Sequence, residues 1–271
     1  MKKWSLLVVL ALTVSFLAAC GGKEAGSESK KEVTIGATSG PYSDMVTKAI
    51  KPGLEKKGYT VEVKEFSDYI QPNNALAQGD LDANLFQHKV YMETFAKQHN
   101  LELSEVIVVP TAPMGIYSQK FNSIEDIKEG SAIAIPNDPT NAARAFQILE
   151  DAKLITLKPD TDPLTISEKD IDQNVKNLQF KPIEAAQLPR SVDSVDLSAV
   201  PGNYALAANM NLLDAIQLEN MPDQYRNRVV VNTKDVDSQL AKDIKEVVEA
   251  AEFEEVIDEE FKGFGKPEWM K

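Results

Sequence analysis

Asn141 and Arg144 are the residues whose types and spacing best suit the binding of a carboxylate. They follow Asp138 and Pro139, an N-cap residue and a proline in the first helical position, so a helix is predicted to begin here with free amide groups facing outward. A helix N-terminus attracts anions, and a guanidinium can grip a carboxylate with two hydrogen bonds. A surface arginine paired with nearby acids would leave the same pattern, so both interpretations stand.

Aromatic side chains form a second candidate group. Phe86, His88 and Tyr91 directly follow a predicted strand, and Tyr69 shortly precedes a predicted helix. Rings at a strand end could enclose a flat or polarizable apolar group, since sulfur beside a ring is favourable by about 0.3–1.5 kcal/mol. They could equally be ordinary core residues. Asn203, after a strand-like segment, is either a third polar contact or a turn asparagine.

The sequence offers little for catalysis or metal binding. A nucleophile usually needs a base, and the only histidines are His88 and His99. No common hydrolase, zinc-protease or phosphate-loop motif is present, and the histidines lack the close spacing of zinc sites. The sequence therefore predicts no enzyme, cofactor or metal. A surface-anchored hydrolase that uses an unrecognised carboxylate pair stays as the alternative from another class.

Residues 1–20 are typical of an exported lipoprotein. Two lysines precede an apolar stretch at residues 4–16, which is short for a membrane span, and Leu17-Ala18-Ala19-Cys20 follows. We expect a signal peptide over residues 1–19 and lipidation of Cys20, which would anchor the protein on the extracytoplasmic face of the cell membrane. A membrane span or a buried helix is the alternative. Residues 20–32 lack large apolar side chains and are predicted to be a flexible tether.

The charge balance limits the partners. The chain has 42 acidic and 29 basic residues among 271, for a net charge of −13. Binding of nucleic acid or of anionic lipid headgroups needs a basic face, so neither is expected. A strongly acidic protein is expected to be a soluble monomer.

From residue 33 onward, strand-like and helix-like segments alternate, which predicts an α/β fold with mainly parallel sheets. Segments near residues 110–115 and 226–231 could each carry the chain between two lobes. We expect residues 33–110 plus 228–271 in lobe I, residues 111–227 in lobe II, and a ligand cleft between them. The strands are predicted at 33–37, 61–63, 81–85, 106–109, 132–135, 178–180, 195–197 and 229–231, and the helices at 41–57, 71–78, 91–98, 123–130, 142–149 and 240–251.

Five segments in order resemble the methionine-binding lipoprotein family (NlpA/MetQ), and the likeness extends from about Val33 to the C-terminus. They are DANLFQH at 82–88, PMGIYS at 113–118, PNDPTN at 136–141, EAAQLPR at 184–190 and GNYA at 202–205. Two departures are visible, Val90 in place of a common proline and the sequence at 207–210. The resemblance implies a two-lobed, type II-like periplasmic-binding-protein fold that delivers methionine to an ABC transporter permease with its ATPase.

The resemblance also implies the roles of the site residues. Arg144 would clasp the ligand carboxylate, and Asn141 and Asn203 would hydrogen-bond the amino-acid end. The side-chain pocket would be lined by Tyr69, Phe86, His88 and Tyr91. Some relatives bind a Gly-Met dipeptide or either methionine enantiomer, so these ligands and other apolar amino acids are the alternatives.

Overall fold

The computed structural model describes residues 31–271. The predicted signal peptide (1–19), the lipidated Cys20 and all but the last two residues of the tether (20–32) lie outside these residues. Within the described part, residues 32–271 form one compact unit. The first strand already begins at Lys31, two residues before the predicted start. No helix of residues 31–271 is long and apolar enough to cross a membrane.

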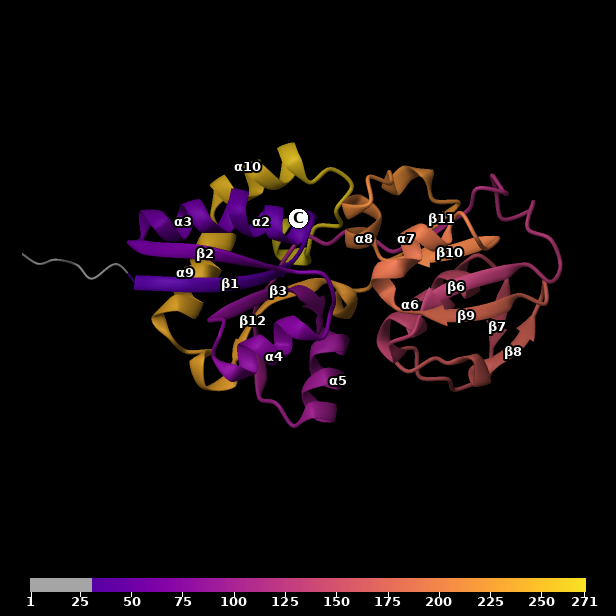
Figure 1. Cartoon of the computed structure of the whole chain (residues 1–271), viewed down its shortest axis with the longest axis horizontal. Helices are drawn as coiled ribbons and strands as arrows, with labels where there is room; N and C mark the ends of the chain where they lie inside the picture. Colours follow the sequence, from indigo (N-terminus) through magenta and orange to yellow (C-terminus); the bar gives the residue numbers. More distant parts are fainter. Residues whose placement is uncertain (1–30) are drawn as a thin grey trace, which may run out of the picture. The chain divides into compact units, whose positions relative to one another are not determined.

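The first sheet has five strands in the order β2-β1-β3-β12-β4. β1 and β3 are parallel, whereas β12 is antiparallel to both β3 and β4, so the sheet is mixed rather than mainly parallel. Figure 1 shows its strands at the left with helices around them. The strands are β1 (Lys31–Thr38), β2 (Tyr59–Phe66), β3 (Ala83–His88), β4 (Leu103–Val108) and β12 (Asn227–Asn232). The helices are α2 (Pro41–Met45), a π-helical turn (Val46–Ile50), α3 (Lys51–Lys56), α4 (Gln71–Gln78), α5 (Lys89–His99), α9 (Gln239–Val248) and α10 (Ala251–Glu260).

The second sheet also has five strands, in the order β11-β5-β10-β6-β9, and it is mixed as well. β6 is parallel to β9 and β10, while β5 is antiparallel to β10 and β11. Its strands are β5 (Gly115–Tyr117), β6 (Ala132–Pro136), β9 (Gln179–Ile183), β10 (Leu197–Val200) and β11 (Gln217–Leu218). A two-stranded sheet, β7 (Ile155–Leu157) with β8 (Ile171–Asn174), and the helices α6 (Pro139–Asp151), α7 (Leu188–Ser191) and α8 (Gly202–Ala207) accompany it.

Short 3₁₀ turns complete the described elements, at Glu168–Asp170, Ala185–Gln187, Leu212–Asp214, Asp223–Tyr225, Thr233–Asp235 and Glu268–Met270. Each five-stranded sheet has its own apolar core, the first with Ile35, Leu85 and Val229 at its centre and the second with Ile116, Ile133 and Leu197. The chain passes from the first core to the second between β4 and β5, and returns between β11 and β12. The predicted lobe boundaries stay a prediction.

Local end signals placed several helices correctly. α4 ends at Gly79, whose φ of 84° suits glycine, and α5 ends at Asn100, whose φ is 53°. α6 begins at Pro139, and the Asp138 side chain accepts a hydrogen bond from the Asn141 amide, as an N-cap residue should.

One predicted helix is wrong and another ends earlier than predicted. Residues 123–130 form bends, turns and irregular backbone instead of a helix, and the Asp126 side chain accepts a hydrogen bond from the Asn122 amide. The C-terminal helix predicted over 240–251 is broken before Ala251, where α10 begins. The break lets Val247 of α9 and Phe253 of α10 pack into the same core.

The apolar run predicted as a strand at 106–109 is typical of a buried strand, but β4 lies at the edge of the first sheet. Only Ile107 of its six residues is fully buried.

Candidate ligand-binding site

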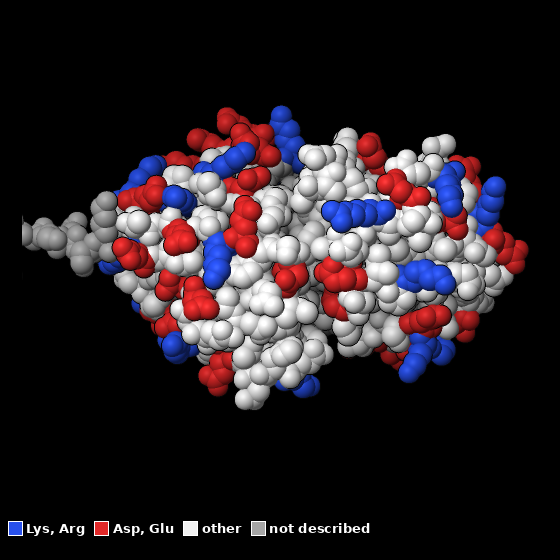
Figure 2. Space-filling view, viewed as in Figure 1, with Lys and Arg blue, Asp and Glu red and all other residues white. Residues whose placement is uncertain are grey.

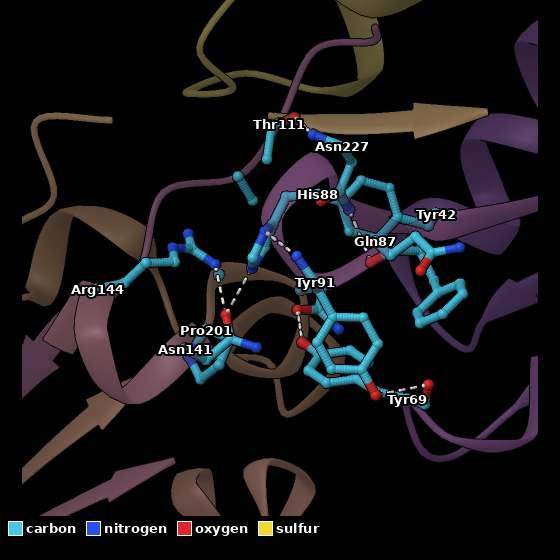
Figure 3. A pocket seen from close by; sticks show the side chains of 14 residues that line it. Tyr42, Tyr69, Gln87, His88, Tyr91, Thr111, Asn141, Arg144, Pro201 and Asn227 are labelled. Atoms are coloured by element: carbon cyan, nitrogen blue, oxygen red, sulfur yellow. Dashed lines mark hydrogen bonds between the residues drawn. The ribbon is translucent and has the colours of Figure 1, made fainter. Parts of the chain in front are cut away.

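A small cavity is lined by residues from the segments that surround both sheets. All seven residues predicted for the site line it (Figure 3): Tyr69, Phe86, His88, Tyr91, Asn141, Arg144 and Asn203. Seven further residues that were not predicted to contact the ligand line it, although Gln87 belongs to the segment of the predicted aromatic group: Tyr42, Gln87, Thr111, Ala112, Pro201, Gly202 and Asn227. The structure therefore brings the predicted residues together, and their roles toward a ligand stay a prediction.

The start of α6 supplies the polar side of the cavity. Asp138 Oδ1 accepts hydrogen bonds from the Asn141 amide at 2.9 Å and from the Thr140 hydroxyl at 2.9 Å. The prediction of free amides at this helix N-terminus is thus wrong for Asn141, because the cap residue itself takes that donor. The side chains of Asn141 and Arg144, one turn apart, do share a face, since Arg144 Nη1 donates to Asn141 Oδ1 at 2.8 Å.

Arg144 is held by Glu219, a partner that sequence reasoning missed. Nε donates to Oε1 at 2.8 Å and Nη2 to Oε2 at 2.6 Å, and the two side chains are only 6% and 5% exposed. This arginine is therefore neither on the surface nor paired with a local acid. Glu219 thus occupies the side of the guanidinium that is formed by Nε and Nη2. Of the two N–H groups on each Nη, Asn141 takes one on Nη1 and Glu219 takes one on Nη2, so each nitrogen keeps one N–H that can donate to a second carboxylate.

The charge of Arg144 is maintained despite its burial. Burial by itself lowers the pKa of Arg144, but the adjacent Glu219 carboxylate raises it, and the net result is a raised pKa. The site thus has a permanent cation whose counter-ion belongs to the protein.

His88 is a neutral hydrogen-bonding group. Its Nδ1 accepts from the Tyr91 amide at 3.1 Å, so the proton of a neutral ring lies on Nε2, 3.2 Å from Asn141 Oδ1. Burial and the nearby Arg144 charge hold the pKa of His88 well below its usual 6.5. Both ring nitrogens are thereby engaged, which leaves His88 no free nitrogen to act as a base or as a metal ligand. Among residues 31–271, no three His, Cys, Asp or Glu side chains gather as a metal site requires.

Aromatic rings form the opposite side of the cavity. Tyr69 lies with its ring centre 5.9 Å from those of Phe86 and Tyr91 and 4.9 Å from that of Tyr204. Its hydroxyl donates to Asn203 Oδ1 at 2.6 Å, and burial raises the pKa of Tyr69 well above 10.0, so the ring stays uncharged. The Tyr69–Asn203 bond joins the loop between β2 and α4 to α8.

Asn203 has one hydrogen-bonding group that the protein does not use. While Oδ1 accepts from Tyr69, the buried Nδ2 has no partner in the described part of the chain. A buried unpaired donor costs about 1–3 kcal/mol, which a bound acceptor would recover. The position of Asn203 depends on Gly202, because a Cβ there would lie 2.4 Å from the carbonyl oxygen of Pro113.

The unpredicted lining residues carried no recognisable signal. Asn227, the first residue of β12, donates from its amide to Thr111 Oγ1 at 2.7 Å and from Nδ2 to the Phe86 carbonyl at 2.9 Å. These contacts span 116 and 141 residues of sequence, so no local pattern could reveal them. They fix the end of β3 from which Phe86 and His88 enter the cavity.

The comparisons with known proteins point to one family. The model of the NlpA lipoprotein family matches residues 33–269. The chain is 36% identical to the probable D-methionine-binding lipoprotein MetQ of Pasteurella multocida, with 97% of each chain covered. It is 33% identical to the methionine-binding lipoprotein MetQ of Bacillus subtilis, again with 97% of each covered.

Solved structures agree with the fold prediction. A nutrient binding protein from Burkholderia cenocepacia, solved bound to methionine, superposes with a TM-score of 0.81 at 39% identity, covering 85% of this chain and 97% of that one. The predicted α/β, two-lobed periplasmic-binding-protein fold is therefore confirmed, and each lobe is built on one of the two mixed sheets.

Proposed function

The chain belongs to the NlpA lipoprotein family, and we propose that it captures methionine outside the cell membrane and delivers it to an ABC importer. The observation that carries the proposal is the pair of unused donors in a cavity with an aromatic wall. Arg144 keeps one N–H on each of Nη1 and Nη2 after it bonds Glu219 and Asn141, and Asn203 keeps its Nδ2. An amino acid supplies a carboxylate for these donors and a side chain for the rings.

The proposed ligand pose follows from the two sides of the cavity. The carboxylate lies at the unused N–H groups of Arg144 and near Asn203 Nδ2, and the amino group lies near Asn141. The thioether lies among Tyr69, Phe86 and Tyr91, where sulfur–ring contacts favour it by about 0.3–1.5 kcal/mol. His88 completes this pocket as a neutral donor. The alternatives are a Gly-Met dipeptide and another apolar amino acid.

We further propose capture by closure of two lobes, residues 33–110 plus 228–271 and residues 111–227. Two hydrogen bonds join the sides of the cavity, Tyr69 to Asn203 and His88 to Asn141. A ligand that contacts both sides adds to these bonds only when the lobes are closed, so its binding favours the closed state. The closed protein would then dock on the permease, whose ATPase drives release.

In this proposal the protein is a carrier with no catalytic role. The neutral His88 has both nitrogens engaged, and the one carboxylate in contact with Arg144 is tied into an ion pair. A hydrolase needs a free base beside a nucleophile, so a turnover assay with dipeptides and esters should give no product above the background. Steady hydrolysis that Arg144→Ala abolishes would instead support the alternative.

Membrane attachment through Cys20 is part of the same proposal. The Cys20→Ser variant should be released as a soluble protein with unchanged methionine affinity, because the tether separates the anchor from the folded lobes. Cell fractionation and calorimetry measure the two effects. A variant that stays in the membrane fraction would mean that the first nineteen residues act as a retained span.

The identity of the ligand is tested most simply by what the protein carries. The full chain is purified under mild conditions and denatured, and the supernatant is analysed by mass spectrometry. Methionine in near-equal amount to protein is the expected result. Gly-Met would move the assignment to dipeptides, and a charged amino acid in that amount would overturn it.

A further inference from the structure

The cavity is nearly free of charge although the protein is highly charged. Figure 2 shows acidic and basic side chains spread over the visible face of both lobes. By contrast, Arg144 is the one Lys, Arg, Asp or Glu among the described residues that line the cavity. Burial keeps His88 neutral by lowering its pKa, and it keeps Tyr69 and Tyr91 neutral by raising theirs.

Glu219 lies just behind this single charge and cancels it. It contacts the far edge of the guanidinium through both carboxylate oxygens, and it is 5% exposed. Its Oε2 also accepts from the Met114 amide at 3.0 Å, and its own amide donates to the Met114 carbonyl at 2.9 Å. Because Glu219 lies on the return crossing and Met114 on the outgoing one, the carboxylate is fixed from two directions.

The other charged groups close to the site are committed elsewhere. Asp138 caps α6 through the Asn141 amide and the Thr140 hydroxyl. Arg228, whose charge contributes to the lowered pKa of His88, pairs with Glu105 at 2.5 Å and with Asp223 at 3.0 Å. Asp138 keeps its negative charge, because its hydrogen-bond partners are neutral, and this charge also disfavours an anion in the cavity. The charge in direct contact with Arg144 is that of Glu219.

We propose that Glu219 makes the site selective for zwitterionic amino acids over anions that have the same side chain. The inference rests on the proposed function and names its ligand class more narrowly. In a poorly solvated cavity, a zwitterionic ligand has no net charge, so the ligand and the Arg144–Glu219 pair together stay neutral. An anion without an ammonium group leaves an uncompensated negative charge, which burial disfavours.

The order of charges also favours the zwitterion. From the return crossing toward the cavity, the charged groups follow one another in space as the Glu219 carboxylate, the Arg144 guanidinium, the ligand carboxylate and the ligand ammonium. Each charge then neighbours charges of opposite sign, and the ammonium is also attracted at longer range by Glu219. The fixed Glu219 repels the carboxylate of any ligand, but only a zwitterion carries the compensating cation.

The test compares two ligands that differ in this one charge. Methionine and its 2-hydroxy analogue share the carboxylate and the thioether, while a hydroxyl replaces the ammonium. Calorimetry on the full chain should show that the wild type prefers methionine by about tenfold or more, and that Glu219→Gln reduces this preference by about tenfold or more. The ratio of the two affinities isolates the effect of charge, because a displaced Arg144 would weaken the binding of both ligands to a similar degree.

Two control variants sharpen the result. Glu219→Asp keeps the negative charge and should retain the preference even where its affinities fall. Asp223→Asn removes a carboxylate from the same crossing. Because this carboxylate pairs with Arg228 and not with Arg144, the preference should be unchanged.

Each outcome bears on one statement. An unchanged ratio in Glu219→Gln overturns the role of Glu219. Equal binding of the two ligands by the wild type does the same, whether or not any variant folds. A wild type that binds methionine in neither calorimetry nor thermal denaturation would contradict the proposed function itself, which is a separate result.

Discussion

The two sides of the cavity differ in how they are built and in what they can hold. On the side of the first lobe, rings contact rings, with centres about 6 Å apart for Tyr69, Phe86 and Tyr91. On the side of the second lobe, Asn141 and Arg144 are fixed by hydrogen bonds and one buried ion pair. Packing between rings tolerates ligands of similar size, whereas fixed donors demand one functional group at one place.

This difference separates two properties of the proposed binding protein. The polar side should determine whether an amino acid binds at all, and the aromatic side should determine which one binds. Substitutions on the two sides should therefore have different signatures, and the following predictions use that contrast.

The largest effect is expected on the polar side. Arg144→Ala should weaken methionine binding by about 2–5 kcal/mol, roughly 30-fold or more, because the carboxylate loses a charged partner inside the cavity. All amino acids should be affected alike. Calorimetry measures the loss, and Arg190→Ala, an exposed arginine on α7, is the matched control.

Glu219 complicates that variant, because removal of its partner leaves a buried charge and destabilises the fold by about 3–5 kcal/mol. Arg144→Lys keeps the charge and the fold but loses the planar fork, so it should recover only part of the affinity. Methionine binding near the wild-type level in Arg144→Lys and Arg144→Ala would contradict the role of the guanidinium.

On the aromatic side, Phe86→Ala should cost about 2–4 kcal/mol of methionine binding through lost packing. Unlike the arginine variants, it should also change the ranking of amino acids in a thermal-shift series, since Phe86 contacts the ligand side chain in the proposed pose. Phe95→Ala is the control, because Phe95 packs on Tyr91 but does not line the cavity. A Phe86→Ala ranking identical to that of the wild type would remove the distinction between the two sides.

The smallest effect concerns His88, which lies where the two sides meet. Its pKa in the folded protein is well below 6.5, so at pH below about 6.5 the unfolded chain binds a proton that the folded one does not. Stability is thus fully present above that pH and falls on acidification, by up to about 1.4 kcal/mol per pH unit from this group. Urea unfolding between pH 7 and 5 should show the loss. His88→Gln should reduce this pH dependence of the free energy of unfolding, whereas substitution of the exposed His99 by Gln should not. An equal pH dependence in the wild type and both variants would contradict the burial argument.

How much the sequence could predict depended on how far apart along the chain the interacting residues lie. The start of α6 was predictable because Asp138 and Pro139 act within one turn. Glu219 was not, since it meets Arg144 across 75 residues and no pattern distinguishes it from the other 41 acidic residues. Physical reasoning from single segments singled out all seven site residues but left a surface, core or turn interpretation open for most of them, and the family resemblance supplied their expected roles.

The predicted helix at 123–130 shows the opposite error, in which a local signal was present but misleading. Ser123 and Asp126 fit a helix start, and the Asp126 carboxylate does bond the Asn122 amide, yet no helix follows. A side chain that can cap a helix can also replace one, and only the surrounding packing decides between these outcomes.

The most direct test of the account is a thermal-shift panel on the full chain with the twenty amino acids and Gly-Met, after unfolding and refolding to remove any carried ligand. A neutral polar side and an aromatic side together predict that methionine gives the largest stabilisation. Leucine should bind about 1–2 kcal/mol less tightly, because a branched aliphatic chain lacks the sulfur–ring contacts. Charged amino acids should give almost no shift, since their side chains would be buried among rings without a partner. A panel led by a charged or polar amino acid would contradict the assignment of the cavity.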